Sequence, residues 1–194
     1  MSRKRVGVLI SGRGSNMSAL IEASKAPDYP ADIVGVLSNR AAAPGLEIAA
    51  QHGIATASLA QSKFFSREMF EDTMTQVLES WEVDFVCLAG FMRILGEDFV
   101  NRWQGRMINI HPSLLPAYRG LDTHNRVLAD GGTEHGCTVH FVTPGLDEGP
   151  AILQAGIPVL PDDTAETLTA RVLIEEHRIY PEALRMLASG EVSF

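Results

Sequence analysis

An amide and an imidazole stand two residues apart in an apolar segment of the chain, where Asn109 and His111 alternate with Ile108 and Ile110. Residues two apart in a β-strand point to the same face, so the two polar side chains are expected to project together. Pro112 keeps His111 out of helical geometry. The amide can donate to a developing oxyanion, and the imidazole can donate a proton or a hydrogen bond near neutral pH. The pair therefore favours acyl chemistry, with a purely structural role for both residues as the alternative.

A carboxylate that could complete this pair lies in the loop Thr143–Pro150, which has the sequence TPGLDEGP. Asp147 or Glu148 could serve the histidine directly or through a bridging water, and an ordinary turn aspartate in a hairpin is the alternative. No Gly-x-Ser-x-Gly sequence accompanies these residues, which argues against a serine hydrolase.

A glycine-containing loop, Ser11–Asn16 with the sequence SGRGSN, follows the first apolar segment and opens a helical pattern. Its glycines permit positive φ, and Ser15 or Asn16 can cap the helix. Free amides at such a helix start bind anions. Met17 stands where a dinucleotide-binding loop needs glycine, Ser38–Arg40 lacks the ribose-binding acid, and no Walker sequence occurs. A single phosphate fits this loop best, and a capped turn without ligand is the alternative.

The remaining metal-type and nucleophilic side chains are interpreted as structural. Cys87 and Cys137 are expected to be buried thiols of a reducing compartment rather than a disulfide or a nucleophile. His124, His135 and His140 are expected to be surface or structural histidines, because they lack the spacings of metal-binding motifs. The sequence therefore predicts no metal site.

Short apolar segments that predict strands alternate with segments of helical periodicity. The expected strands are Val6–Ile10, Ile33–Leu37, Ala55–Leu59, Phe85–Ala89 and Met107–Ile110. The expected helices are Asn16–Ser24, Pro44–Gln51, Ser66–Ser80 and Thr164–Leu187, with a break in the last helix at Pro181 left open. After residue 111 the chain is rich in Gly and Pro, and Cys137–Thr143 and Ala151–Val159 are expected to form an antiparallel pair.

This order of elements predicts an α/β fold with a doubly wound, mostly parallel sheet, helices on both faces and an antiparallel C-terminal part. Sites in such sheets lie beyond the C-terminal ends of the strands. We expect one domain over residues 1–194. The Leu115–Pro116 bond is left open as cis or trans.

Composition excludes several classes of protein. The 194 residues carry a formal net charge of −8 at pH 7, which argues against a broad nucleic-acid surface. The apolar segment Val6–Ile10 is too short for a signal peptide, and no apolar segment approaches membrane-spanning length. A cytoplasmic protein with no membrane partner is the expectation.

Taken together, these segments resemble the folate-dependent formyltransferases over nearly the whole chain, and most closely the branch that acts on glycinamide ribonucleotide. The resemblance is carried by Ile10–Asn16, Leu88–Leu95, Asn109–Pro116, His135–His140, Leu146–Pro150 and Glu175–His177. The wider family shares the Asn-x-His pair and the later Asp, and the Ser-Gly-x-Gly-Ser-Asn loop is more specific to this branch. Asp122 departs from the pattern, because many relatives carry His at that position.

The resemblance implies a role for each matching residue. Asn109, His111 and Asp147 would be catalytic, Gly14, Ser15 and Asn16 would bind the substrate phosphate, and Glu176 would meet the ribose or glycinamide. Folate contacts would come from Arg67, Met92, Arg93, Ile94, Leu95, Asn109, Thr143 and Asp147. Residues 1–100 would form a phosphate- or nucleotide-binding half and residues 101–194 a catalytic and folate-binding half.

The resemblance also implies the partners. The co-substrate would be 10-formyltetrahydrofolate, and no metal would be needed. Glycinamide ribonucleotide and the reduced folate would be the partners of a monomer or homodimer.

Two other classes of function stay open. Another folate-dependent formyltransferase or a formyltetrahydrofolate hydrolase is one, although such proteins commonly carry a further domain for which 194 residues leave no room. A non-catalytic nucleotide-binding module is the other, and it leaves the Asn109, His111 and Asp147 set unexplained. Met17 and the missing acid disfavour a NAD-dependent dehydrogenase.

Overall fold

The computed structural model describes residues 2–194 and contains one seven-stranded sheet with the strand order β3-β2-β1-β4-β5-β6-β7. The strands are β1 Lys4–Ile10, β2 Ala31–Ser38, β3 Ala55–Ser58, β4 Phe85–Leu88, β5 Met107–His111, β6 Glu134–Phe141 and β7 Ala151–Pro158. All neighbours from β3 to β5 are parallel, whereas β6 runs antiparallel to both β5 and β7. The predicted α/β class and the antiparallel C-terminal part are confirmed.

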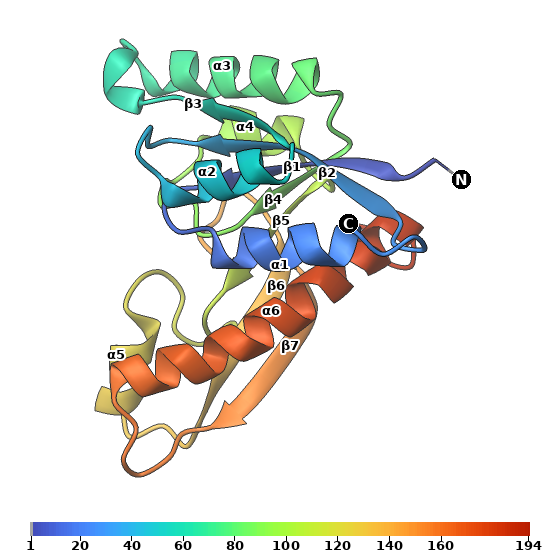
Figure 1. The fold of residues 1–194 in the computed structure, drawn as a ribbon. Coiled ribbons are helices and arrows are strands. Elements are labelled where there is room, and N and C mark those ends of the chain that lie inside the picture. Colours follow the sequence, from blue (N-terminus) through green and yellow to red (C-terminus); the bar gives the residue numbers. More distant parts are fainter. Residues whose placement is uncertain (1) are drawn as a thin grey trace.

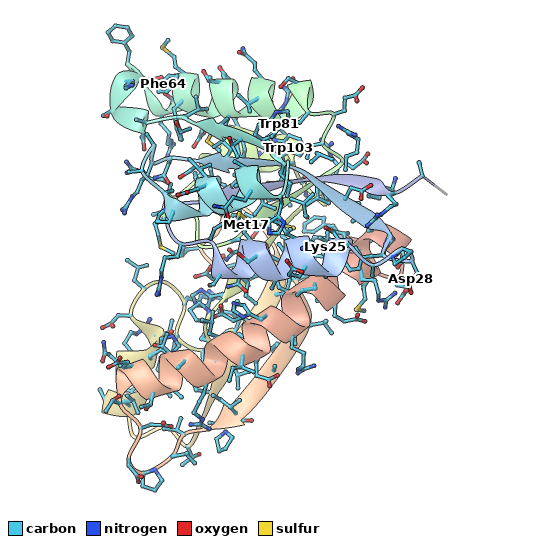
Figure 2. The ribbon with its side chains drawn as sticks, in the orientation of Figure 1. Met17, Lys25, Asp28, Phe64, Trp81 and Trp103 are labelled. Atoms are coloured by element: carbon cyan, nitrogen blue, oxygen red, sulfur yellow. The ribbon has the colours of Figure 1, made fainter. Side chains whose placement is uncertain are left out.

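Helices cover both faces of this sheet (Figure 1). They are α1 Ser15–Ser24, α2 Pro44–Gln51, α3 Arg67–Ser80, α4 Glu97–Arg102, α5 Thr123–Ala129 and α6 Ala165–Ser189, with a short 3₁₀ helix at Gln61–Lys63. One hydrophobic core joins the sheet to α1 and α6, and a second core joins the opposite face to α3 and α4. Figure 2 labels Met17 on the α1 side of the sheet and Trp103 on the α3 side. The doubly wound arrangement is therefore confirmed.

Two short helices were not expected from the sequence, and the course of the last helix at Pro181 was left open. The short helices α4 and α5 lie in segments that the sequence left as loops, because six or seven residues are too few to show helical periodicity. Helix α6 continues through Pro181 without a break over 25 residues. Its buried face packs on the sheet along most of its length, and this packing outweighs the hydrogen bond that a proline removes.

Tyr180 of α6 contacts β4 and β5 near the C-terminal ends where a site is expected. Its buried hydroxyl lies 2.9 Å from the Leu88 carbonyl oxygen and 3.2 Å from that of Ile108, so it ties α6 to β4 and β5. The segment after β5 contains a cis peptide bond at Leu115–Pro116, which settles the isomer that the sequence left open. None of the helices within residues 2–194 is both long enough and apolar enough to cross a membrane.

Candidate active site

Asn109 of β5 stands directly opposite His140 of β6 in the antiparallel register. The Asn109 Nδ2 atom lies 3.2 Å from His140 Nε2, and His140 Nδ1 lies 2.8 Å from the Phe141 carbonyl oxygen. Burial lowers the pKa of His140, and the Phe141 carbonyl and Asp147 only partly oppose this effect. The amide of Asn109 is thus paired with a neutral imidazole on the neighbouring strand.

His111, two residues further along β5, faces Asp147. Its Nδ1 atom lies 3.4 Å from Asp147 Oδ2, and its Nε2 atom lies 3.0 Å from the Tyr118 carbonyl oxygen. Because a carbonyl oxygen only accepts hydrogen bonds, Nε2 carries a proton and Nδ1 is the atom presented to the carboxylate. The two groups are nine-tenths buried or more, so a positive charge on the ring would interact with the carboxylate with little screening by water.

Asp147 adopts the left-handed conformation with a φ of 51°, which asparagine and aspartate tolerate better than most residues. Its Oδ2 accepts a hydrogen bond of 2.9 Å from the backbone N–H of Gly120, and its Oδ1 lies 3.7 Å from His140 Nε2. Glu148, the other carboxylate that the sequence offered, pairs instead with Arg119 at the surface. The structure therefore brings Asn109, His111 and Asp147 together.

These three side chains form part of the wall of a cavity of about 590 Å³. The remaining wall is mostly apolar and comes from the segments after β4, β5 and β6. Of the residues expected to contact folate, the lining includes Met92, Arg93, Ile94, Leu95, Asn109, Thr143 and Asp147. A cavity of this size and composition is typical of sites for a drug-sized organic ligand.

Arg67 is the one expected folate residue that does not line this cavity. It begins α3, and its Nε lies 3.9 Å from the buried carboxylate of Glu71. Glu71 accepts a hydrogen bond of 2.7 Å from the backbone N–H of Gly96, the residue that follows Leu95. Arg67 therefore lies beside the end of the cavity-lining segment rather than in the cavity wall.

The glycine loop takes a different form from the predicted one at its helix start. Gly14 is the N-cap residue of α1 with a φ of 74°, and Ser15 and Asn16 lie in the first helical turn without capping it by a side chain. Neither Ser15 nor Asn16 takes the capping role that the sequence allowed, because the N-cap position has a left-handed conformation that glycine adopts without strain. The amides of the first turn have no partner within a helix and stay available to an anion.

A second cavity, of about 470 Å³, opens beside this loop between α1, α2 and α6. Ser15 is the one predicted phosphate residue in its lining, together with Arg13, Ser18 and His177. Gly45 approaches the loop closely, because its N–H donates to the Gly12 carbonyl across 3.1 Å and an added Cβ would lie 2.5 Å from Ile10. The loop is thus held tightly against the start of α2.

Asn16 and Glu176 are both buried and are bonded to each other. Asn16 Nδ2 donates to Glu176 Oε2 across 2.6 Å, and the Asn16 Oδ1 atom is buried without a hydrogen-bond partner in the described structure. Burial raises the pKa of Glu176, and the Asn16 hydrogen bond partly opposes the rise. Two residues that the sequence assigned to different parts of one substrate therefore stand side by side.

Ser11 connects the glycine loop to the segment that lines the larger cavity. Its Oγ donates to Asn39 Oδ1 across 2.6 Å and accepts a hydrogen bond of 2.7 Å from the backbone N–H of Met92. Its own N–H donates to the Gly90 carbonyl. One buried hydroxyl thus joins the glycine loop to a segment in the wall of the larger cavity.

The sequence missed part of the histidine arrangement. His140 is buried beside Asn109 and Asp147, and both His140 and His124 line the larger cavity, whereas the sequence indicated only surface or structural roles for the three histidines. His135 is buried, and its Nε2 lies 3.1 Å from His124 Nδ1. The β5–β6 register is the signal that places His140 beside Asn109, and it requires the sheet pairing. Among residues 2–194, no three His, Cys, Asp or Glu side chains are grouped as metal ligands.

Comparison with known proteins places this site in a family. Residues 4–184 match the formyl transferase family. The chain is 49% identical to the phosphoribosylglycinamide formyltransferase of Escherichia coli over 185 residues, covering 95% of this chain and 87% of that protein. The crystal structure of phosphoribosylglycinamide formyltransferase from Brucella melitensis is 52% identical with a TM-score of 0.93 and coverage of 98% on both sides. The corresponding Coxiella burnetii structure is 48% identical with a TM-score of 0.95, covering all of this chain and 90% of that one.

Larger relatives contain the same unit. The chain is 52% identical over 190 residues to the trifunctional purine biosynthetic protein adenosine-3 of Drosophila pseudoobscura pseudoobscura. The match covers 97% of this chain and spans only 14% of the length of that protein. The chain therefore belongs to the formyl transferase family and, within it, to the phosphoribosylglycinamide formyltransferases.

Proposed function

We propose that this protein transfers the formyl group of 10-formyltetrahydrofolate to the amine of glycinamide ribonucleotide. The products are formylglycinamide ribonucleotide and tetrahydrofolate, in the de novo synthesis of purine nucleotides. The convergence of Asn109, His111 and Asp147 on one wall of the 590 Å³ cavity is the observation that carries the proposal. The names of the relatives support the acceptor and the reaction class.

The folate occupies the larger cavity in this proposal. The apolar wall suits the stacked rings of a pteridine and an aminobenzoate, and Asn109, Thr143 and Asp147 supply the few polar groups that orient such a ligand. Arg93 lines the cavity, and Arg67 lies beyond the end of the same segment. These two cations are available to the carboxylates of the folate glutamate tail.

Glycinamide ribonucleotide lies across the glycine loop with its phosphate on the first-turn amides from Ser15 onward. Gly14 allows the backbone to approach the phosphate, because it has no side chain in the way. Glu176 faces the ribose hydroxyls or the glycinamide, and its bond to Asn16 fixes its position beside the loop. The acceptor amine then extends toward Asn109.

The reaction is a direct attack of the glycinamide nitrogen on the formyl carbon. Asn109 Nδ2 donates a hydrogen bond to the oxygen as the carbonyl becomes a tetrahedral oxyanion, and the positive charge of protonated His111 stabilises that oxyanion. Protonation of His111 places the new hydrogen on Nδ1, next to Asp147, because Nε2 already donates to the Tyr118 carbonyl. The carbon–nitrogen bond to the folate breaks as the carbonyl re-forms.

Proton movement completes the step without a covalent enzyme intermediate. The attacking nitrogen loses one proton, and N10 of the departing folate gains one, so the total is unchanged. Asp147 orients His111 and, through a water molecule, helps to carry this proton. Holding both substrates in one place supplies much of the rate acceleration.

Spectrophotometric detection of tetrahydrofolate formation, with glycinamide ribonucleotide present or omitted, tests this proposal. We expect product only when the acceptor is present. Formation of tetrahydrofolate and formate without acceptor would instead identify a hydrolase. Binding of nucleotide with no turnover under either condition would identify a non-catalytic module and overturn the proposal.

A further inference from the structure

His140 is a buried residue beside Asn109 and Asp147 to which the proposed mechanism gives no role. It is 3% exposed, and it lies on β6 directly opposite Asn109. Its two ring nitrogens have different neighbours, because Nδ1 meets the Phe141 carbonyl oxygen and Nε2 meets Asn109 Nδ2. Each neighbour restricts where the imidazole can carry its proton.

The Phe141 carbonyl fixes the proton of His140 on Nδ1. A carbonyl oxygen has no hydrogen to give, so the 2.8 Å contact is a hydrogen bond only if Nδ1 donates. Burial lowers the pKa of the ring, which keeps it neutral near pH 7, so Nε2 has only a lone pair. His140 is therefore an acceptor at the atom that faces Asn109.

An acceptor at His140 Nε2 fixes the orientation of the Asn109 amide in turn. The 3.2 Å contact is attractive only if Asn109 presents its NH₂ group, since a flipped amide would place two lone pairs against each other. One N–H of Asn109 is used by His140, and the second N–H stays free on a side chain that lines the cavity.

We propose that His140 is the positioning residue that holds the Asn109 amide with an N–H, rather than its carbonyl oxygen, directed at the formyl oxygen. This inference rests on the proposed function, since it concerns the oxyanion donor of that reaction. A flipped amide would place a carbonyl dipole against the developing negative charge and remove the donor.

The groups around His140 support the neutral form. Asp147 Oδ1 lies 3.7 Å from Nε2, and Asp147 and His111 are the ionisable groups that act on the ring through their charges. If Nε2 carried a proton, it would interact with the Asp147 carboxylate and could not accept a hydrogen bond from Asn109. Burial in β6 prevents this, because it penalises the charged ring more than Asp147 favours it.

A matched pair of variants at His140 separates this role from simple packing. Glutamine places its Oε1 near the position of Nε2 and can accept from Asn109, whereas asparagine replaces only the Nδ1 side of the ring. We expect His140→Gln to keep a kcat near that of the unmodified protein. We expect His140→Asn to lower kcat by about tenfold or more, because the Asn109 N–H is no longer directed at the formyl oxygen. The KM for the folate should not change, because the Asn109 side chain still lines the cavity.

A double-mutant cycle tests whether His140 acts through Asn109. In the Asn109→Ala background, His140→Asn should have no further effect on kcat, since no amide is left to orient. The proposal is overturned if His140→Asn turns over like the unmodified protein, or if it lowers kcat by the same factor in both backgrounds. Circular dichroism establishes that each variant is folded.

The imidazole ¹⁵N signals of the unmodified protein give a test that needs no variant and no turnover. We expect His140 to carry its proton on Nδ1 and a free lone pair on Nε2 between pH 7 and pH 8. A proton on Nε2 in this range contradicts the proposal even if formyl transfer is observed. A protein that shows the expected tautomer but transfers no formyl group refutes the proposed function and leaves the His140–Asn109 geometry intact.

Discussion

Asn16 and Glu176, which are 160 positions apart in the chain, share a buried hydrogen bond of 2.6 Å between α1 and α6. The bond joins the helix that begins at the glycine loop to the helix that covers one face of the sheet (Figure 1). Asn16, the donor, directly follows the turn of the glycine loop, and Glu176 is the acceptor. The position of the Glu176 carboxylate therefore depends on the conformation of that loop.

Replacing Asn16 by alanine is expected to weaken both folding and acceptor binding. Glu176 would lose its hydrogen-bond donor while still buried, which lowers the free energy of unfolding by about 1–3 kcal/mol. The KM for glycinamide ribonucleotide should rise more than the KM for the folate. Urea unfolding and steady-state kinetics measure the two effects, with Ser24→Ala on the same helix as the control. An unchanged acceptor KM in a folded Asn16→Ala protein would refute the role of this pair.

Alanine at Asn109 or at His111 is expected to lower turnover while the folate still binds. Each change removes one group that stabilises the oxyanion, and loss of one such group typically reduces kcat by about a hundredfold or more. Steady-state kinetics and equilibrium binding of tetrahydrofolate measure the two quantities. Asn101→Ala on the exposed surface of α4 is the control for a lost asparagine. Turnover near the unmodified level in either variant would exclude that residue from the reaction.

Asp147 and Glu148 provide a matched pair of neighbouring carboxylates. Asp147→Asn keeps the side-chain shape, tolerates the φ of 51° and can still accept from Gly120, but it removes the charge beside His111. We expect kcat to fall by about a hundredfold or more, as is typical when a proton-transfer group is lost. Glu148→Gln should leave kcat unchanged, because this side chain pairs with Arg119 at the surface. The reverse ranking would assign the carboxylate role to Glu148.

The His124–His135 pair predicts a loss of stability in acid. Burial, followed by the charges of His124 and His111, lowers the pKa of His135 from 6.5 to about 4, and burial also lowers the pKa of His124. The unfolded chain therefore binds more protons than the folded protein between these two pKa values, so stability rises with pH in this window. This contribution is fully present above pH 6.5 and is lost as the pH falls toward 4.

Urea unfolding at pH 7.5 and at pH 5 checks this prediction. We expect a lower free energy of unfolding at pH 5, with a smaller difference between the two pH values in His135→Gln. Equal pH dependence in the variant and in the unmodified protein would show that other groups cause the acid sensitivity.

The sequence predicted the parallel part of the sheet well, because strands buried on both faces are continuous apolar segments. The observed β1 and β2 extend the predicted strands by only one or two residues at an end. Helices α4 and α5 were missed, since their form depends on contacts with the rest of the chain rather than on a periodic stripe. The sequence also left open whether the last helix breaks at Pro181. The helix continues, because tertiary packing outweighs the local preference of proline.

The sequence could predict which candidate side chains of a single strand point the same way, but not which side chains of two strands lie side by side. The two-residue spacing of Asn109 and His111 implied their common direction, whereas His140 enters through the register between β5 and β6. The choice between Asp147 and Glu148 required the loop conformation, because neighbouring residues in a turn can point in opposite directions. The N-cap of α1 is Gly14 rather than a polar residue, and this too depends on the backbone conformation.

Transfer of a ¹³C-labelled formyl group, followed by NMR in one reaction mixture, distinguishes formyl transfer from hydrolysis and from ligand binding alone. We expect the labelled carbon to leave 10-formyltetrahydrofolate and to appear on the former amine nitrogen of glycinamide ribonucleotide, with no free formate, and we expect Asn109→Ala to slow this transfer. Label that appears as formate, or that stays on the folate in the presence of the acceptor, would contradict the proposed function.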